Sequence, residues 1–280
     1  MPEPAVSAAG SLPPQNSKCN RDSDLLQTQA TMFKLLCILA SVALAQLASA
    51  FDTSQSVTAT AINAVPFAIT APGNYYLVHD VSFTSPVGAA IFILADGVVL
   101  DLNGRTIRDT GGGLTIGVYV GNHEDVTVQN GNIDNFGQAG VFFNGTSGSD
   151  KNQKNLCRNV RLNNDEIGVL SISGQSNEVA ECVIDGGDIG IFVIDDSGGT
   201  RLFRNTLEAQ HKTQLFGVGI GILDVSGKGI LSEFNLISKG DNALGEFLAS
   251  PTDKYRDESF VAFPANHPIA GGIDEGNSSL

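Results

Sequence analysis

The stretch from residue 90 to residue 223 repeats one three-residue phrase six times: a small residue, then a β-branched residue, then a bulky apolar residue. The copies are Ala90-Ile91-Phe92, Gly117-Val118-Tyr119, Gly140-Val141-Phe142, Gly168-Val169-Leu170, Gly190-Ile191-Phe192 and Gly221-Ile222-Leu223. Their β-branched members lie 27, 23, 28, 22 and 31 residues apart. A period of about 20 to 50 residues is typical of solenoids, so the sequence predicts a stack of similar coils.

A second strand phrase lies between successive copies, so each coil contains at least two short strands. A strand of about three to five residues cannot bury its apolar face alone, but equivalent strands stacked about 4.8 Å apart share a continuous core. Asn159, Cys182 and Asn205 are spaced 23 residues apart. We expect them to share one turn column, because Asn tolerates left-handed backbone and can hydrogen-bond its copy on the next coil. The second phrases are Val98–Leu102, Val126–Val128, Val160–Leu162, Val179–Ile184, Leu202–Leu207 and Leu231–Ile237.

The composition supports short strands and tight turns. Glycine accounts for 32 of the 280 residues, and only 16% of the residues are charged, which argues against helical repeats. The sequence predicts an all-β, right-handed parallel β-helix of about six to eight coils over residues 51–240. A first strand and cap are expected over residues 51–65. A C-terminal cap with a mobile tail is expected over residues 241–280.

Two orientations of the repeated phrase remain open. If the β-branched column points inward, the bulky column forms an outward stripe, in which Tyr119, Phe142 and Phe192 could stack on sugars, meet another subunit or lie under a covering segment. If the bulky column points inward instead, Ser171 and Asp224 face solvent. The sequence slightly favours the outward or covered stripe.

The segment from residue 32 to residue 50, MFKLLCILASVALAQLASA, has the pattern of a secretory signal peptide. It combines a basic residue, a short apolar stretch and a small-residue cleavage site, and the apolar stretch is shorter than the roughly 20 residues of a membrane span. The mature chain is then expected to begin at Phe51 and to be extracellular, or periplasmic in a Gram-negative source. The polar extension 1–31 has two explanations, a signal anchor with a cytoplasmic tail or a true start at Met32, and we favour the second.

Only two cysteines, Cys157 and Cys182, fall in the expected mature chain. They lie about one coil apart, and a single disulfide and two buried thiols are equally compatible with the sequence. Asn144 and Asn277 each begin a glycosylation sequon.

Residues 66 to 240 resemble the pectate-lyase-like superfamily of right-handed parallel β-helix proteins. The resemblance rests on Ile69-Thr70-Ala71-Pro72-Gly73-Asn74-Tyr75-Tyr76-Leu77, on Gly97-Val98-Val99-Leu100-Asp101-Leu102-Asn103-Gly104-Arg105-Thr106-Ile107, and on the Gly-Ile-x-Val and Asn-rich phrases downstream. It implies the fold strongly and the function weakly, because the fold hosts lyases, hydrolases, epimerases, esterases and non-catalytic binders. The Gly-His-Gly and Arg-Ile-Lys phrases of polygalacturonases and the Tyr-Gly-x-Asp-Pro-His phrase of mannuronan epimerases are missing.

The candidate catalytic residues are the remaining carboxylates and the local basic group. Paired carboxylates could act on a glycosidic bond or bind Ca²⁺, and a basic group beside carboxylates is what β-elimination requires. For each of these residues, an ordinary solvated turn or loop charge is the simpler interpretation. The candidates are Asp165, Asp188, Asp195, Asp196, Arg201 and His211.

The net charge of −14 argues against a nucleic-acid partner, and it would repel anionic glycans unless Ca²⁺ or a local basic cluster intervened. We expect a secreted protein that binds or processes an extracellular polysaccharide by lyase-type or hydrolase-type chemistry, or a non-catalytic scaffold or binding protein. No cofactor is required by the sequence, no metal site is assigned, and Ca²⁺ is the one ion left open.

Overall fold

The computed structural model describes residues 58–146, 152–194, 198–208, 218–223 and 229–238, together with five short strands between residues 244 and 274. The chain divides into two units, Met1–Val57 and Thr58–Leu280, and only the second contains described residues. All its described elements are β-strands. No helix among these residues could span a membrane.

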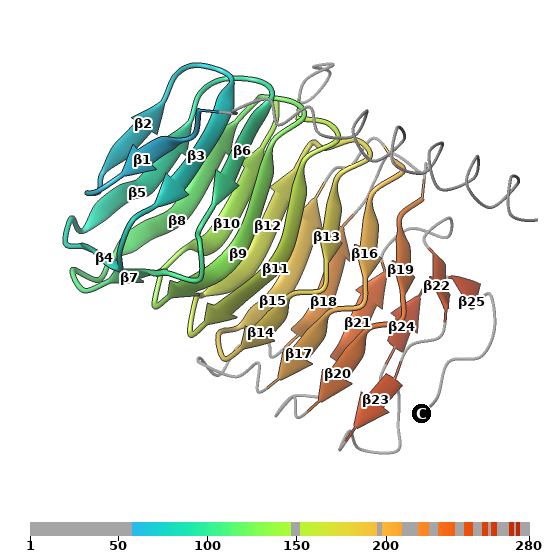
Figure 1. Ribbon diagram of the computed structural model, residues 1–280. Helices are drawn as coiled ribbons and strands as arrows, with labels where there is room; N and C mark the ends of the chain where they lie inside the picture. The colour runs from blue at the N-terminus through green and yellow to red at the C-terminus, as the bar shows by residue number, and fades with distance from the viewer. Residues whose placement is uncertain are drawn as a thin grey trace, which may run out of the picture. The chain divides into compact units, whose positions relative to one another are not determined.

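One flank of the second unit is a parallel sheet of nine strands, and six of them contain a copy of the repeated phrase. Each strand pairs with the equivalent strand of the next coil (Figure 1). The strands are β2 (Phe67–Ile69), β5 (Val87–Ile93), β8 (Leu114–Gly121), β10 (Ala139–Asn144), β12 (Ile167–Ile172), β15 (Ile189–Ile194), β18 (Val218–Leu223), β21 (Leu244–Leu248) and β24 (Ile269–Gly271).

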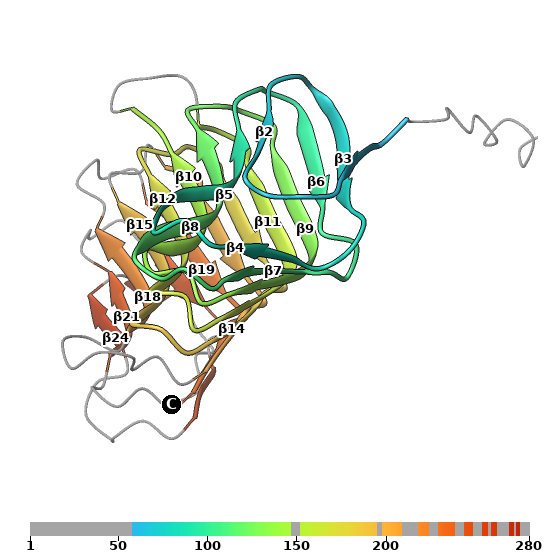
Figure 2. The ribbon, with the colours of Figure 1, turned by 90° about the vertical axis from the view of Figure 1, so that its left-hand side faces the viewer.

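The other two flanks belong to one 16-stranded sheet, which bends once in each coil (Figure 2). The first limb contains β1 (Thr60–Ile62), β3 (Gly73–Leu77), β6 (Val98–Asp101), β13 (Glu178–Ala180), β16 (Arg201–Phe203), β19 (Leu231–Glu233), β22 (Lys254–Arg256) and β25 (Ile273–Asp274). The second limb contains β4 (Val81–Phe83), β7 (Thr106–Asp109), β14 (Val183–Asp185), β17 (Thr206–Glu208), β20 (Leu236–Ser238) and β23 (Ser259–Val261). The long strands β9 (Thr127–Asp134) and β11 (Leu156–Asn163) cross the bend and belong to both limbs.

The parallel β-helix predicted from the repeat is confirmed. The predicted second phrases form the 16-stranded sheet, and strands β21 to β25 continue the same ladders beyond residue 240. The register of the sixth copy differs from the prediction, because Ile191 pairs with Ile220 and Phe192 pairs with Gly221. The segment Gly219-Ile220-Gly221-Ile222 contains the Gly-Ile pair twice, so the sequence offers two registers that differ by two residues.

The β-branched column points inward and the bulky column points outward. Ile91, Val118 and Val141 have no exposed surface, whereas Phe142 and Leu170 belong to a separate apolar cluster on the outer face of the nine-stranded sheet. The alternative with an inward bulky column is wrong: Ser171, which it placed in solvent, is buried.

Buried asparagines hydrogen-bond the backbone of the preceding coil. Asn155 Oδ1 accepts from Val126 N at 3.0 Å, and Asn177 Oδ1 accepts from Asn155 N at 2.9 Å. In a second column, Asn205 Oδ1 accepts from Cys182 N at 3.0 Å. These bonds satisfy amides at turns that the sheet ladders leave unpaired.

The predicted column of Asn159, Cys182 and Asn205 is therefore wrong in one member. Arg161 pairs with Val183, so Cys182 lies opposite Val160, one residue beyond Asn159. The prediction assumed a step of 23 residues from Asn159, but equivalent positions on β11 and the next coil are 22 residues apart.

We predict that Asn205→Leu lowers the free energy of unfolding by about 1 to 3 kcal/mol, because the buried Cys182 N–H loses its acceptor. Urea unfolding measures the change. Asn132→Ala, on the outer side of β9, is the control and should have a smaller effect. An equal loss in both variants would contradict the internal role of Asn205.

Cys157 and Cys182 are free thiols in contact with each other. Both are buried, and their sulfur atoms lie 3.8 Å apart on adjacent coils. A hydrogen bond with Cys182 and burial raise the pKa of Cys157 well above its ordinary value. A buried thiol with a raised pKa reacts slowly, because the thiolate is the reactive form.

We predict that, in a folded chain that begins at Phe51, Cys157 and Cys182 do not react with a thiol reagent such as DTNB, and that they react fully in denaturant. Absorbance of the released thiolate measures both states. Rapid reaction of the native protein would contradict the burial of this pair, and failure to react in denaturant would show that the pair is a disulfide.

Candidate functional site

The bend of the 16-stranded sheet places a column of side chains on the outside of the molecule. At each bend one residue has left-handed backbone, with φ between 51° and 60° at Asn130, Asn159, Glu181, Arg204 and Phe234. The strand registers place these residues opposite one another on consecutive coils. We call these five residues the bend column. Asn suits the conformation because its short polar side chain tolerates positive φ.

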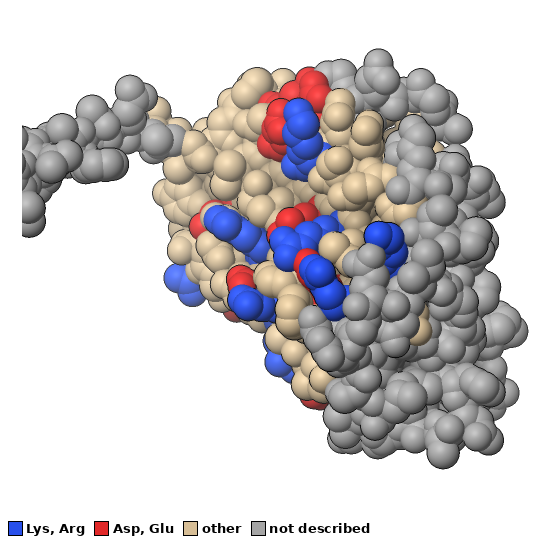
Figure 3. All heavy atoms as spheres, turned by 90° about the vertical axis from the view of Figure 1, so that its right-hand side faces the viewer, with Lys and Arg blue, Asp and Glu red and all other residues tan. Residues whose placement is uncertain are grey.

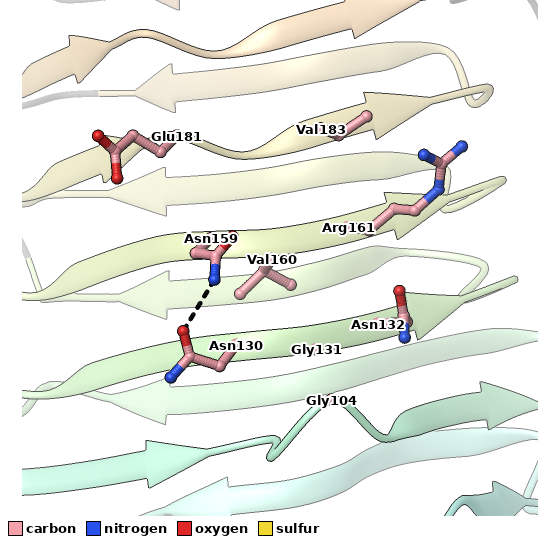
Figure 4. A pocket seen from close by; sticks show the side chains of 9 residues that line it. All are labelled: Gly104, Asn130, Gly131, Asn132, Asn159, Val160, Arg161, Glu181 and Val183. Carbon is pink, nitrogen blue, oxygen red and sulfur yellow. Dashed lines mark hydrogen bonds between the residues drawn. The ribbon is translucent and has the colours of Figure 1, made fainter.

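A groove of about 310 Å³ lies over the N-terminal part of the bend column (Figure 4). Asn159 Nδ2 donates to Asn130 Oδ1 at 2.9 Å, which fixes both amides. Gly131 forms part of the lining, where a Cβ atom would lie 2.3 Å from Leu102 Cβ. The lining residues are Gly104, Asn130, Gly131, Asn132, Asn159, Val160, Arg161, Glu181 and Val183.

Arginines beside the groove are oriented by neighbouring polar groups. Arg158 donates from Nε and Nη2 to Gln129 Oε1, at 3.0 and 2.7 Å. Arg161 donates from Nε to Asn163 Oδ1 at 2.9 Å, and its Nη2 lies 3.4 Å from Asp185 Oδ2. Fixed guanidinium groups lose less side-chain entropy when they bind a ligand.

The charged residues are distributed unequally between the two sheets. In the part of the chain that the structure describes, every Lys and Arg lies on a strand or turn of the 16-stranded sheet, and strands β5, β8, β10, β12, β15 and β18 contain no charged residue. Figure 3 shows basic side chains next to acidic ones on one face of the molecule. The two flanks formed by the 16-stranded sheet are therefore the polar, hydrogen-bonding side of the molecule.

The structure describes three of the predicted catalytic residues: Asp165 and Asp188 lie at one corner on adjacent coils, and Arg201 lies on a different flank. Asp165 has 1% exposure, and its Oδ1 accepts from Phe136 N at 2.8 Å inside the stack. Asp188 lies in the turn before β15, where its N–H donates to Glu166 O. Arg201, on β16, belongs to another flank and pairs with Glu178 and Glu233. Asp195, Asp196 and His211 lie outside the described residues.

The predicted sugar-stacking residues lie together on the outer face of the nine-stranded sheet. The Tyr119 ring packs edge to face against Phe92 and Phe142, with centroids 5.9 and 5.6 Å apart. Phe192 is half-buried in the same cluster. Phe142 is only 7% exposed, so its ring offers little surface to a ligand.

The two sequons have different positions. Asn144 ends β10, and its Nδ2 donates to Tyr119 Oη at 2.7 Å. Glycosylation would modify this same nitrogen, and Asn144 stays a prediction as a glycosylation site. Asn277 lies outside the described residues.

The groove residues Asn130, Asn132, Arg161 and Glu181 were not predicted from the sequence. These residues share one feature that could have identified them, which is that they lie at or beside the left-handed residue at the bend of each coil. That signal needs the strand register to the single residue, which the irregular coil lengths obscure.

Metal binding would need clustered ligands. Within the described ranges, no group of three or more His, Cys, Asp or Glu side chains could hold a metal ion. Of the acidic residues named above, Asp195 and Asp196 fall outside those ranges, and Ca²⁺ stays a prediction.

A buried carboxylate lies near the C-terminal part of the bend column. Glu233 is 1% exposed and pairs with Arg201 and Arg256. Burial raises the pKa of Glu233, but hydrogen bonds from Arg256 and Arg201 outweigh it and hold the pKa below its ordinary value. The pair of arginines therefore stabilises the ionised form in the folded state.

We predict that Glu233→Gln lowers the free energy of unfolding by about 1 to 3 kcal/mol near neutral pH, because two arginines lose their buried partner. The folded pKa is lower than the unfolded pKa, so this stabilisation is complete above the unfolded value of about 4.3. It is lost as the pH falls through the folded value.

Urea unfolding at about pH 7 and about pH 3 tests the linkage. The difference between wild type and Glu233→Gln should shrink at the lower pH, and the exposed control Glu181→Gln should change little at either. A difference that is unchanged at low pH would contradict the ionised pairing.

The fold and the groove define the class of this chain, a parallel β-helix protein with a polar groove along one flank. No protein-family profile matches the chain, and no curated protein matches it. Among solved structures, it is similar to an alginate lyase from Paenibacillus sp. str. FPU-7, with 14% identity over 83% of this chain and 95% of that chain and a TM-score of 0.46. Similarity at this level does not transfer the activity of the lyase.

Proposed function

We propose that this chain is a secreted protein that binds an extracellular polysaccharide along the bend column, without cleaving it. The observation that carries the proposal is the open groove that Asn130, Asn159, Arg161 and Glu181 line from three adjacent coils. A repeating solenoid surface suits a repeating polymer, because equivalent groups recur about every 4.8 Å along the stack.

The groove chemistry suits sugar hydroxyl groups. Side-chain amides both donate and accept hydrogen bonds, as hydroxyl groups do. Arg161 adds fixed donors and Glu181 adds acceptors, while Val160 and Val183 supply apolar surface for C–H groups. The combination of a few placed polar groups with an apolar lining is typical of small-molecule sites.

The same lining argues for binding over catalysis. Canonical glycoside hydrolysis uses two carboxyl groups that flank the bond, and among the described residues Glu181 is the only carboxylate that lines the groove. Elimination needs a general base beside a neutralised uronate. Among the lining residues that the structure describes, Glu181 and Arg161 are the only ionisable groups, and Arg161 stays protonated.

The proposed secretion rests on the segment 32–50. Removal of a signal peptide would leave a mature chain that begins at Phe51. N-terminal sequencing of the protein recovered from the culture medium or the periplasm is expected to read Phe-Asp-Thr-Ser. A secreted protein that retains residues 32–50 would contradict the prediction of a cleaved signal peptide.

The binding test uses the mature protein with xylan, pectin and alginate oligosaccharides in isothermal titration calorimetry. We predict that Asn159→Gly combined with Arg161→Gln weakens binding about tenfold, because it removes about two hydrogen bonds worth about 0.5 to 1.5 kcal/mol each. Gly tolerates the positive φ of Asn159, so the backbone is retained.

Asn164→Gly is the matched control, because Asn164 has φ 53° at a different turn. It should bind like wild type. Equal affinity of the groove variant and wild type would contradict the site. Release of reducing ends or unsaturated uronates by the wild type would contradict the absence of cleavage.

A further inference from the structure

The bend column changes its chemistry toward its C-terminal end, where an exposed aromatic residue occupies the left-handed position. Phe234 has φ 58° and 45% of its surface is exposed. Left-handed backbone is unfavourable for an ordinary residue, and for a bulky side chain it is a genuine outlier. Because nearly half of Phe234 remains exposed, burial of the ring offsets this cost only in part.

Neighbouring side chains hold an aromatic and cationic cluster at this point. The Phe234 ring packs edge to face on Phe203, with centroids 5.8 Å apart at 88°. The guanidinium carbons of Arg201 and Arg204 lie 4.0 and 4.7 Å from the Phe203 centroid. Arg201 is itself fixed by Glu233, so the cluster is supported from the interior.

The cluster lies in line with the groove. The registers of β13 with β16 and of β16 with β19 place Arg204 opposite Glu181, and Phe234 opposite Arg204. Two coil steps of about 4.8 Å put Phe234 roughly 10 Å beyond Glu181 along the stack. A polymer that follows the bend column out of the groove therefore reaches Phe234.

We propose that Phe234 and Arg204 form a sugar-stacking subsite that extends the groove. The ligand class is a pyranose ring, whose apolar C–H face packs on the Phe234 ring while Arg204 donates to a hydroxyl or carboxylate oxygen. The strained conformation at Phe234 fits this assignment, because strained backbone clusters at binding sites. This inference rests on the proposed polysaccharide binding.

The decisive variant is Phe234→Asn, which gives position 234 the residue type found at Asn130 and Asn159. Asn tolerates positive φ, so we expect an unchanged or higher melting temperature. For an oligosaccharide long enough to reach from the groove to position 234, we expect affinity to fall about fivefold to tenfold. For one that fills the groove alone, we expect no change.

Two further variants complete the test in the same titrations. Phe234→Tyr should retain the affinity of the long oligosaccharide. Leu236→Asn removes another exposed apolar side chain, 37% exposed and two residues away, and should bind both lengths like wild type.

The outcomes separate the subsite from the groove. If Phe234→Asn binds the long oligosaccharide like wild type while the Asn159→Gly and Arg161→Gln variant loses affinity, the subsite is overturned and polysaccharide binding stands. If Phe234→Asn lowers the melting temperature and the affinity for both lengths, Phe234 is a structural residue and the subsite is overturned. If the wild type binds no oligosaccharide, both proposals fall.

Discussion

The bend of the 16-stranded sheet is the constraint on which the surface of this protein depends. Each coil must bend around the core at the same register. The residue at the bend takes left-handed backbone, as Asn130, Asn159 and Glu181 do. Such a residue points away from the core. Parallel stacking then aligns the exposed side chains of successive coils in one column, so the geometry that closes the coil also builds the groove.

The interior and the two outer surfaces have different tasks. Inside, β-branched residues form the continuous core, and asparagines such as Asn155 and Asn205 hold the turns of successive coils together. The outer face of the nine-stranded sheet is apolar and, over its described strands β5 to β18, uncharged. The bent sheet has the oriented amides and arginines, and it is the surface on which we propose ligand recognition.

The sequence was sufficient to predict the fold because the stack requires the same small, β-branched and bulky phrase in every coil. The sequence left the orientation of the phrase open, because either the β-branched or the bulky column could fill the interior. The burial of Val141 and the partial exposure of Tyr119 decide between them. The double Gly-Ile at residues 219–222 hid the sixth register.

The site was harder to predict than the fold. Residue type alone predicts Asp165 as a catalytic residue. In the structure, its carboxylate is an internal hydrogen-bond acceptor. The groove instead depends on which residue occupies the bend, and a shift of one residue replaces the exposed Asn159 by the buried Val160. Variable coil lengths conceal such a shift in a single sequence.

A crystal structure of the protein with a bound oligosaccharide tests the central claim most directly. The account predicts sugar density along the bend column, over Asn130 and Asn159 and continuing past Arg204 toward Phe234. Density on the outer face of the nine-stranded sheet around Tyr119, with none over the bend column, would contradict it.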